Sequence, residues 1–141
     1  MNDPYNLHRF VAAHNAGNTY DRALEELRRG RKTSHWMWFV FPQIAGLGHS
    51  QMSRTFAIGS LDEARAYLRH PVLGPRLIEC AEVVASASAR TAEEIFGSID
   101  ARKLHSSMTL FLRADPTQPL FRRVLDRYFD GLADMATDRR L

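Results

Sequence analysis

Residues 60–87 read SLDEARAYLRHPVLGPRLIECAEVVASA, and they hold the clearest secondary-structure signals of the chain. Ser60 and Glu63 have the spacing of a capping box, in which each side chain can satisfy an exposed backbone N–H at a helix start. The helix that they open must end before His70-Pro71, because a residue that precedes proline avoids the α region. A second helix, over 72–87, is expected to bury one apolar face, made of Leu73, Leu77, Cys80, Val84 and Ala87.

Helical signals continue on both sides of this stretch. Toward the N-terminus they predict helices over about 7–15 and from about Thr19 to Gly30. Another helix is expected between Ser50 and Gly59. Toward the C-terminus we expect a capping box at 91–94 that opens a short helix closed by Gly97, a helix over about 101–114 capped by Asp100, and a last helix over about 120–129.

These elements predict an all-α fold of about six to eight helices with short connections, because no alternating apolar run is long enough to build a sheet. The 141 residues contain no internal repeat, no low-complexity segment and no long linker. We therefore expect a single helical domain over 1–141, with its core at about 7–131.

One segment has an ambiguous pattern. Residues 34–42 are apolar on every side and end at Pro42. Periodicity cannot distinguish a buried strand from a short buried helix here. Both alternatives stay open from the sequence.

Composition favours a cytoplasmic protein. Apolar residues make up 45% of the chain and charged residues 25%, which is ordinary globular composition. Cys80 is the single cysteine, so no intrachain disulfide can form, which fits a reducing compartment. Residues 1–6 lack the features of a signal peptide, and the longest apolar run, 36–42, is far too short to span a membrane.

The charge pattern bears on partners. The formal net charge is +3, and one basic cluster stands out at Arg28, Arg29, Arg31 and Lys32. Elsewhere acidic and basic residues are interspersed, as on a solvated helical surface. Nucleic-acid binding is disfavoured, because only one basic cluster exists and no helix repeats lysine or arginine along a face.

The most unusual stretch is 30–43, GRKTSHWMWFVFPQ, which holds both tryptophans beside basic residues. Aromatic rings next to cations suit a planar anion such as a nucleotide, because the ring stacks and the cations meet phosphate. Alternatively, the aromatic side chains are core and the cations are solvated. We expect one tryptophan to be structural and the other to lie beside a pocket that includes Arg31 and His35.

Two further segments carry polar side chains. The glycine-rich loop 46–48 leads into a helix and could hold an anion, although an ordinary turn is the commoner use. Lys103 and Ser107 lie one turn apart on a helix face, where small hydroxyl residues either bind a ligand or let another helix approach. The six histidines show no zinc-ligand spacing, so we expect no metal. Cys80 is expected to be a buried apolar side chain rather than a nucleophile.

Several motifs resemble one bacterial family. They are the tryptophan stretch, Gly46-Leu47-Gly48, the segments 70–77 and 95–97, and Lys103-Leu104 with Ser106-Ser107-Met108-Thr109-Leu110-Phe111. Together they are similar to the domain of unknown function 1810, sometimes labelled calpastatin-like. The resemblance covers about 7–131. It implies a compact multihelical domain that stands alone, and it brings no established activity, cofactor or catalytic residue.

Two main functions follow from the sequence. The first is a domain, enzymatic or not, that binds a phosphate-bearing or nucleotide-like small molecule in a basic and aromatic pocket. Its ligand-binding residues would be Arg31, Lys32, His35, Trp36, Gln43, Ser50, Lys103 and Ser107. The second is a partner-binding or structural domain without a small-molecule ligand. No complete catalytic motif is present, no catalytic residue or protein partner is identified, and neither a cofactor nor a membrane is expected.

Overall fold

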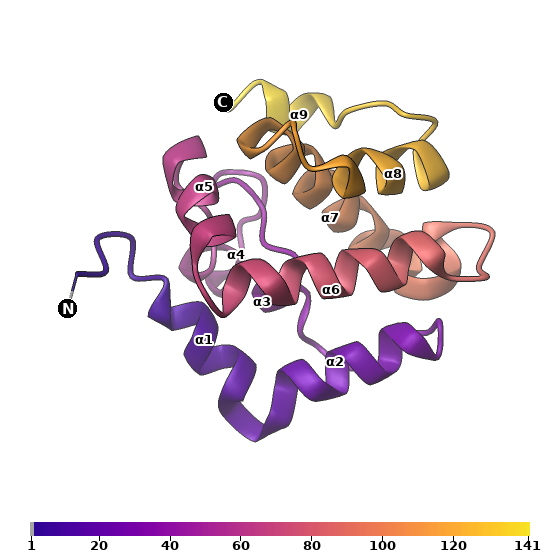
Figure 1. The fold of residues 1–141 in the computed structure, drawn as a ribbon, viewed down its shortest axis with the longest axis horizontal. Coiled ribbons are helices and arrows are strands. Elements are labelled where there is room, and N and C mark those ends of the chain that lie inside the picture. Colours follow the sequence, from indigo (N-terminus) through magenta and orange to yellow (C-terminus); the bar gives the residue numbers. More distant parts are fainter. Residues whose placement is uncertain (1) are drawn as a thin grey trace.

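The computed structural model describes residues 2–141, and helices make up most of the chain (Figure 1). The chain is 64% helical, and its described part contains no strand, which confirms the all-α prediction. Six helices have eight or more residues: α1 (His8–Asn15), α2 (Thr19–Arg28), α5 (Leu61–Arg69), α6 (Leu73–Ser86), α7 (Ala92–Ala114) and α8 (Pro119–Tyr128). The shorter elements are η1 (Ala16–Asn18), α3 (Met37–Val40), α4 (Gln51–Thr55) and α9 (Met135–Asp138).

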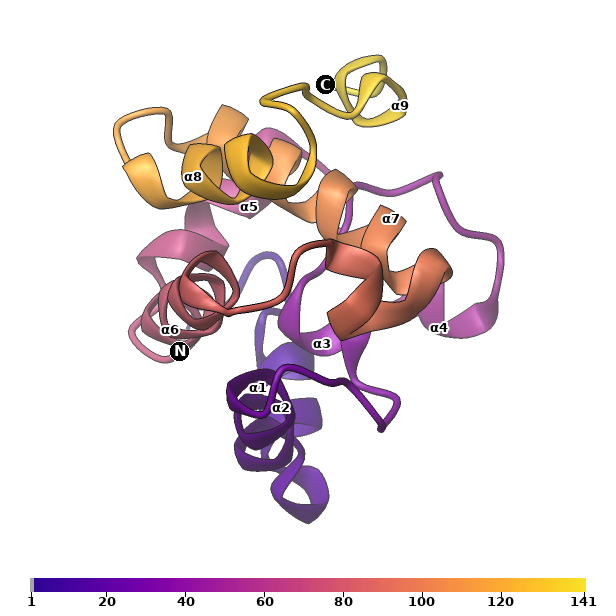
Figure 2. The ribbon, with the colours of Figure 1, turned by 90° about the vertical axis from the view of Figure 1, so that its right-hand side faces the viewer.

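The helices fall into two groups joined by α6. At one end, α1 and α2 form a V and pack on α3 and α6 (Figure 1). At the other, α7 packs between α5 and α8 and also contacts α9. The view turned by 90° places α9 at the opposite end of the molecule from α1 and α2 (Figure 2). The long connection between α3 and α5 runs past α4 on the side of α7 (Figure 2).

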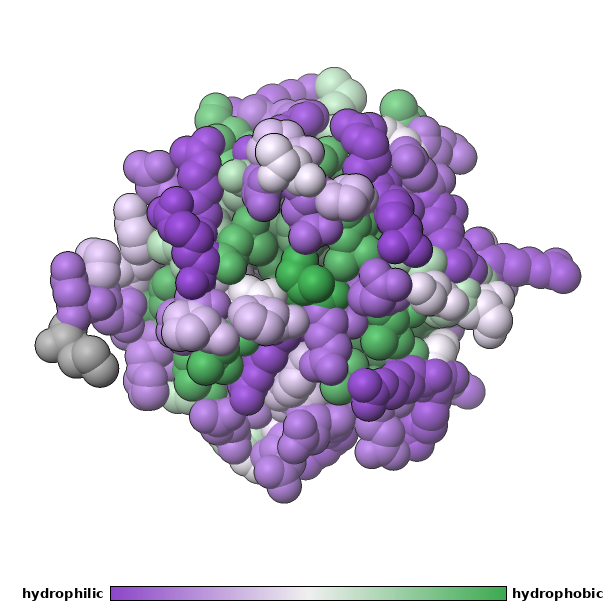
Figure 3. Space-filling view, viewed as in Figure 1, coloured by the Kyte–Doolittle hydropathy of each residue, from purple (hydrophilic) through white to green (hydrophobic). Residues whose placement is uncertain are grey.

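The core is strongly aromatic. One cluster of buried apolar side chains extends from Leu7 to Leu125. Its largest members are at most 1% exposed: Trp36, Tyr67, Phe10, Phe41, Phe111 and Phe121. Each such side chain stabilises the fold by roughly 1.5–3 kcal/mol through burial. Hydrophilic residues cover much of the surface, with apolar side chains visible between them (Figure 3).

Both capping boxes form only by half. The Ser60 and Thr91 hydroxyls accept the N–H of Glu63 at 3.1 Å and of Glu94 at 3.2 Å, as expected. The glutamate carboxylates, however, accept N–H groups from the residues before each cap rather than from the caps themselves. Glu63 bonds Gly59 in this way and also forms an ion pair with Arg9 at 2.8 Å.

The ambiguous segment is a single helical turn. Met37–Val40 forms α3, so the short buried helix is correct and the strand is not. The chain then runs extended, and Ile44 makes one isolated parallel bridge with Ile58. This bridge holds the α3–α4 connection against the segment before α5 without building a sheet.

Three local predictions need correction. The helix expected between Ser50 and Gly59 is shorter, because α4 ends at Thr55. Asp100 does not cap a helix: α7 runs on from Ala92 with its break at Gly97, where φ is 78°. The side chain of Asp100 forms ion pairs instead. Helix α9 was not expected, and it buries Thr137 completely.

Candidate functional site

A buried carboxylate organises the segment between α2 and α3. Glu26, on α2, accepts the backbone N–H groups of Thr33 at 2.8 Å and Ser34 at 2.9 Å. It also accepts the Ser34 hydroxyl and, at 2.9 Å, the indole N–H of Trp36. Burial raises the pKa of Glu26, but these hydrogen bonds outweigh it and lower the pKa to about 2. Trp36 is only 1% exposed, so this tryptophan is part of the core.

Two lysines share one carboxylate beside the tryptophans. The ammonium of Lys32 lies 2.7 Å from Asp100 and 5.0 Å from the centre of the Trp36 ring. The ammonium of Lys103 lies 3.5 Å from the same carboxylate and 4.8 Å from the centre of the Trp38 ring. We call these five side chains the tryptophan–lysine cluster.

The two lysines of this cluster are not equivalent. Lys32 has a side chain only 7% exposed, makes the shorter ion pair, and donates to the carbonyl of Ser34 at 2.6 Å. Lys103 is 22% exposed and makes the longer ion pair. Two ammonium groups and one carboxylate leave a net charge of about +1 in the cluster. Because Lys32 is the better neutralised, that excess charge is located mainly at Lys103.

Lys103 faces a depression of about 550 Å³, which we call the Lys103 cleft. The α3–α4 connection, the middle of α7 and the start of α9 form its walls. Its lining residues are Gln43, Leu47, Gly48, Arg102, Lys103, His105, Ser106, Asp134 and Ala136. Two of the ligand-binding residues expected from the sequence, Gln43 and Lys103, therefore meet here, although they lie far apart in the chain.

The other polar groups of the cleft are held in place by the fold. Asp134 accepts the hydroxyls of Ser106 at 3.2 Å and Thr137 at 2.6 Å, and it caps α9. His105 stacks on Phe129 with ring centres 4.2 Å apart. Its Nε2 lies 2.7 Å from the carbonyl oxygen of Leu132, so Nε2 must carry the proton. The Nδ1 atom of His105 makes no hydrogen bond within residues 2–141.

Two enclosed polar atoms, neither of them in the lining of the cleft, lack a protein partner in the described chain. They are Nε1 of Trp38 and Oγ of Ser107. Buried polar groups in proteins are nearly always hydrogen-bonded, to water or ligand where protein offers nothing. Trp38 lies against Lys103, and Ser107 follows Lys103 by one helical turn. One of the two groups therefore lies on the ring that contacts Lys103, and the other lies one turn along the same helix.

The remaining sequence candidates lie elsewhere. Arg31 lines another depression, of about 440 Å³, formed with Lys32 and the residues around Gly97. His35 is exposed, and Ser50 caps α4 by accepting the N–H of Ser53 at 3.1 Å. The structure therefore does not join Arg31, His35 and a tryptophan ring in one pocket.

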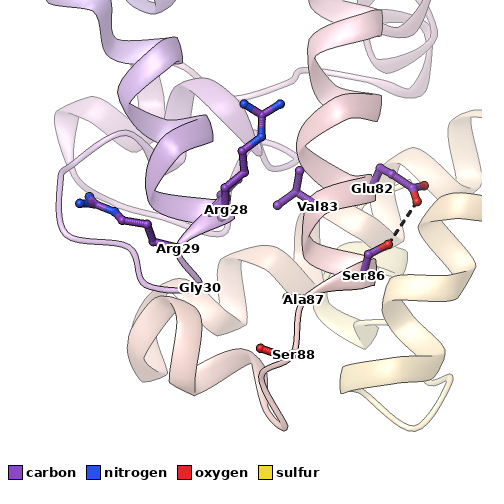
Figure 4. Close-up of a pocket in the computed structure, with 9 residues that line it drawn as sticks. Arg28, Arg29, Gly30, Glu82, Val83, Ser86, Ala87 and Ser88 are labelled. Atoms are coloured by element: carbon purple, nitrogen blue, oxygen red, sulfur yellow. Dashed lines mark hydrogen bonds between the residues drawn. The ribbon is translucent and has the colours of Figure 1, made fainter.

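The basic cluster is also divided. Arg28 and Arg29 line a third depression, of about 500 Å³, opposite Val83 and Ser86 on α6. Their side chains point in different directions, as Figure 4 shows. Glu82 at its edge accepts a hydrogen bond from Ser86 at 3.2 Å (Figure 4). Four cations that are close in sequence thus serve two separate surfaces.

Sequence reasoning missed several residues of the Lys103 cleft. The sequence predicts that Asp100 caps a helix, and the ligand-binding residues expected from it do not include Arg102, Ser106 or Asp134. A signal was present for Ser106, which belongs to the serine-containing helix that the sequence singled out. None was present for Asp134, because α9 is a single turn whose position depends on tertiary contacts.

Residues 2–141 hold neither a membrane-spanning helix nor a cluster of metal-binding side chains. No helix there is both long and apolar enough to cross a membrane. No three side chains of histidine, cysteine, aspartate or glutamate gather there as a metal ion would require.

The fold and the site define a small helical domain with a tryptophan–lysine cluster beside a polar cleft. The chain belongs to the family described as "Protein of unknown function (DUF1810)", whose model matches residues 4–141. The resemblance drawn from the motifs is therefore confirmed.

A solved structure shares this architecture. The chain is similar to a conserved hypothetical protein from Mycobacterium tuberculosis whose crystal structure is known. The two sequences are 50% identical, the match covers 99% of this chain and 98% of the other, and the TM-score is 0.95. No curated protein matches the chain. Neither comparison assigns an activity.

Proposed function

We propose that this protein binds a phosphate-bearing or nucleotide-like small molecule in the Lys103 cleft. The observation that carries the proposal is the sharing of Asp100 by Lys32 and Lys103, at 2.7 and 3.5 Å. One carboxylate cannot neutralise two ammonium groups, so the more exposed lysine retains an attraction for an anion. Arg102 adds a second cation to the lining of the same cleft.

The cleft is prepared for such a ligand. Lys103 is held between Asp100 and the Trp38 ring, so little side-chain entropy remains to be lost on binding. Gln43 offers an amide with both a donor and an acceptor. The volume of about 550 Å³ lies within the range of about 300–1,000 Å³ that is usual for small-molecule pockets.

The two unsatisfied groups lie outside the lining of the cleft, so a ligand with several acceptor oxygens would use them only if the cleft opened further. The indole N–H of Trp38 can only donate, and the Ser107 hydroxyl can donate or accept. Phosphate and ribose oxygens accept such hydrogen bonds. A ligand that reached either group would remove the free-energy cost of an unmade hydrogen bond, which is about 1–3 kcal/mol.

A thermal-shift screen tests the proposal. Nucleotides, sugar phosphates and inorganic phosphate are added separately to the wild-type protein. We expect at least one organic phosphate to raise the melting temperature, since a ligand that prefers the folded state stabilises it. The variant Lys103→Gln should lose most of this increase. The control Arg122→Gln removes an exposed cation on α8, away from the cleft, and should keep it.

Two results would contradict the proposal. One is the absence of any shift across the whole panel. The other is an equal shift in wild type and Lys103→Gln, which would place the bound anion elsewhere on the molecule.

A partner-binding role is the second candidate, and one observation favours it. Ile99, Leu132 and Met135 are large apolar residues with 65–69% of their surface exposed. Two of them belong to the C-terminal segment that forms one wall of the cleft. Sedimentation velocity of the wild-type protein and of Leu132→Ser, each alone and mixed with a protein tested as a partner, would detect such an interaction. The wild type should form the larger species and Leu132→Ser should not.

We also place the protein in the cytoplasm. Its one cysteine, Cys80, is a free thiol that is 0% exposed. Burial raises the pKa of this thiol to about 12. An unreactive, unpaired thiol fits a reducing compartment. Fractionation of cells that express the tagged protein tests the location, and recovery outside the cytosolic fraction would contradict it.

A further inference from the structure

The segment 70–77, His70-Pro71-Val72-Leu73-Gly74-Pro75-Arg76-Leu77, has no role in the Lys103 cleft. Most of it serves the turn between α5 and α6. The ring Nδ1 of His70 accepts the N–H groups of Val72 at 3.1 Å and Leu73 at 3.2 Å, and thus caps α6. Gly74 lets the two helices approach closely. Arg76 is the polar residue of this segment that the turn does not explain.

Arg76 is an arginine without a carboxylate partner. Within residues 2–141 no carboxylate oxygen lies close enough to form an ion pair with it. Its guanidinium carbon lies 4.6 Å from the centre of the Tyr20 ring, so the aromatic face fixes the plane of the group. The NH1 group contacts Nδ1 of His14 at 3.2 Å and Oδ1 of Asn15 at 3.4 Å. The Nε and NH2 donors find no acceptor in the described chain.

This guanidinium faces a polar depression of about 260 Å³, which we call the Arg76 cleft. Residues from the α1–η1–α2 turn and from α6 line it: His14, Asn15, Asn18, Tyr20, Asp21 and Arg76. Asn18 has a left-handed backbone with φ of 60°, a conformation that costs free energy in residues other than glycine. The turn that shapes the cleft is therefore held by its surroundings.

His14 does not supply a second positive charge to the cleft. Its Nε2 lies 2.6 Å from the carbonyl oxygen of Phe39, so Nε2 carries the proton and Nδ1 accepts from Arg76. Burial lowers the pKa of His14 to about 4, and the nearby charge of Arg76 acts in the same direction. At neutral pH the cleft therefore contains one cation, Arg76, and one anion, Asp21 on its rim.

We propose that the Arg76 cleft binds a small monoanionic carboxylate through the free Nε–NH2 edge of Arg76. Two parallel N–H donors match the two oxygens of a carboxylate, which gives a bidentate pair. The rim charge of Asp21 disfavours a dianion such as phosphate, because like charges repel in a partly enclosed site. The Asp21 carboxylate can accept a hydrogen bond from a hydroxyl or ammonium group of the bound acid.

Titration followed by NMR tests this site with acetate and inorganic phosphate as probes. The reporters are the Nε–H signal of Arg76 and the ring signals of Tyr20 and His14. We expect acetate to shift them saturably and to bind more tightly than phosphate. Arg76→Gln should weaken acetate binding at least about tenfold, because charge-assisted hydrogen bonds are lost. Arg122→Gln is the control and should bind acetate like the wild type.

Asp21→Asn provides a test that leaves Arg76 and the core untouched. Removing the rim charge should strengthen phosphate binding more than acetate binding, since the dianion suffers more from the repulsion. The proposal is overturned if no saturable shift occurs, if Arg76→Gln binds acetate like the wild type, or if phosphate binds the wild type as tightly as acetate. These results are independent of the Lys103 cleft, where Arg76 takes no part.

Discussion

At the scale of single residues, Glu26 and His14 are two buried titratable groups whose pKa values the fold shifts strongly and which bond separate elements together. Glu26 connects α2 to the loop before α3, and His14 connects α1 to the carbonyl of Phe39 on α3. Both are almost fully buried, at 1% and 2% exposure. Glu26 must remain charged, and His14 must remain neutral, for these hydrogen bonds to persist. The stability of the fold therefore depends on the protonation of both.

The two tryptophans should differ in their contribution to stability. Trp36→Ala should cost about 3–5 kcal/mol of the free energy of unfolding, because it leaves a large cavity. It also removes an indole donor from Glu26. Trp38→Ala should cost clearly less, because Trp38 is only half-buried and its indole N–H makes no protein hydrogen bond. Urea denaturation of both variants measures the difference.

Iodide quenching provides an independent check on this pair. The emission that remains in Trp38→Phe comes from Trp36 and should be protected from iodide. The emission that remains in Trp36→Phe should be quenched in part. Equal protection of both tryptophans from iodide would contradict the partial exposure of the Trp38 ring.

Stability should fall in two steps as the pH is lowered. His14 has a folded pKa of about 4 against an ordinary 6.5, so the unfolded chain protonates first and stability is lost between these values. Glu26 has a folded pKa of about 2 against an ordinary 4.5, so its contribution is lost between about 4.5 and 2. Each step is on the order of 3 kcal/mol. Urea midpoints measured across this pH range would show both.

Two variants assign these steps. Glu26→Gln should flatten the lower step and leave the upper one. His14→Gln should flatten the upper one and leave the lower. The comparison uses slopes against pH, so a constant loss of stability in either variant does not affect it. A wild-type profile that is flat between pH 6.5 and 4 would refute the role of His14.

At the scale of helices, the sequence predicted the elements that carry their own signals. A helix with a cap, an apolar face and a proline stop is placed correctly, as for α5, which Ser60 caps and which ends just before His70-Pro71. Single-turn helices are not, because such a helix is unstable alone and depends on its neighbours. Thus α9 was missed, and α3 remained ambiguous until its packing was known.

Helices α5 and α6 approach each other closely where Gly74 meets the backbone of Leu68. A Cβ at Gly74 would lie 2.1 Å from the carbonyl oxygen of Leu68, which is backbone and cannot turn away. Gly74→Ala should therefore force the two helices apart and lower the melting temperature severely. Gly97→Ala is the comparison: its Cβ would meet nothing within 4 Å, and only the positive φ opposes it.

That second substitution should cost roughly 1–3 kcal/mol, the range for a strained backbone. Calorimetry of both variants would rank them. Equal losses would mean that the two helices can shift more easily than the Leu68 contact suggests.

At the scale of the whole molecule, the candidate site depends on contacts that no local pattern encodes. The sequence grouped Arg31 with Lys32 because they are neighbours in the chain, and both line one depression, yet only Lys32 is buried against Asp100 while Arg31 is exposed. It did select Gln43 and Lys103, which now line one cleft. The residue types of Gln43 and Lys103 indicated a binding role from the sequence alone. The ion pairs that both lysines form with Asp100 became visible only in the folded structure.

Helix α9 closes one side of the Lys103 cleft. This helix and its cap Asp134 are docked mainly by polar contacts: the N–H of Asp134 donates to the Thr109 hydroxyl at 2.9 Å, and Arg113 donates to Asp138 at 2.9 Å. Met135, its first residue, is 67% exposed. A segment with little apolar burial opens at a lower free energy than the core. Amides of 136–139 should therefore exchange with deuterium faster than those in the second half of α7.

Asp134→Ala should speed this exchange further while leaving α7 unchanged, because it removes both the α9 cap and the bond to Ser106. If an organic phosphate occupies the Lys103 cleft, it contacts the docked form of α9 and should slow exchange there, since binding to one conformation shifts the population toward it. Arg122→Gln should behave like the wild type. Exchange in α9 as slow as in α7, or unaffected by Asp134→Ala, would mean that α9 is held by the core rather than by its cap, and that the wall of the cleft is rigid.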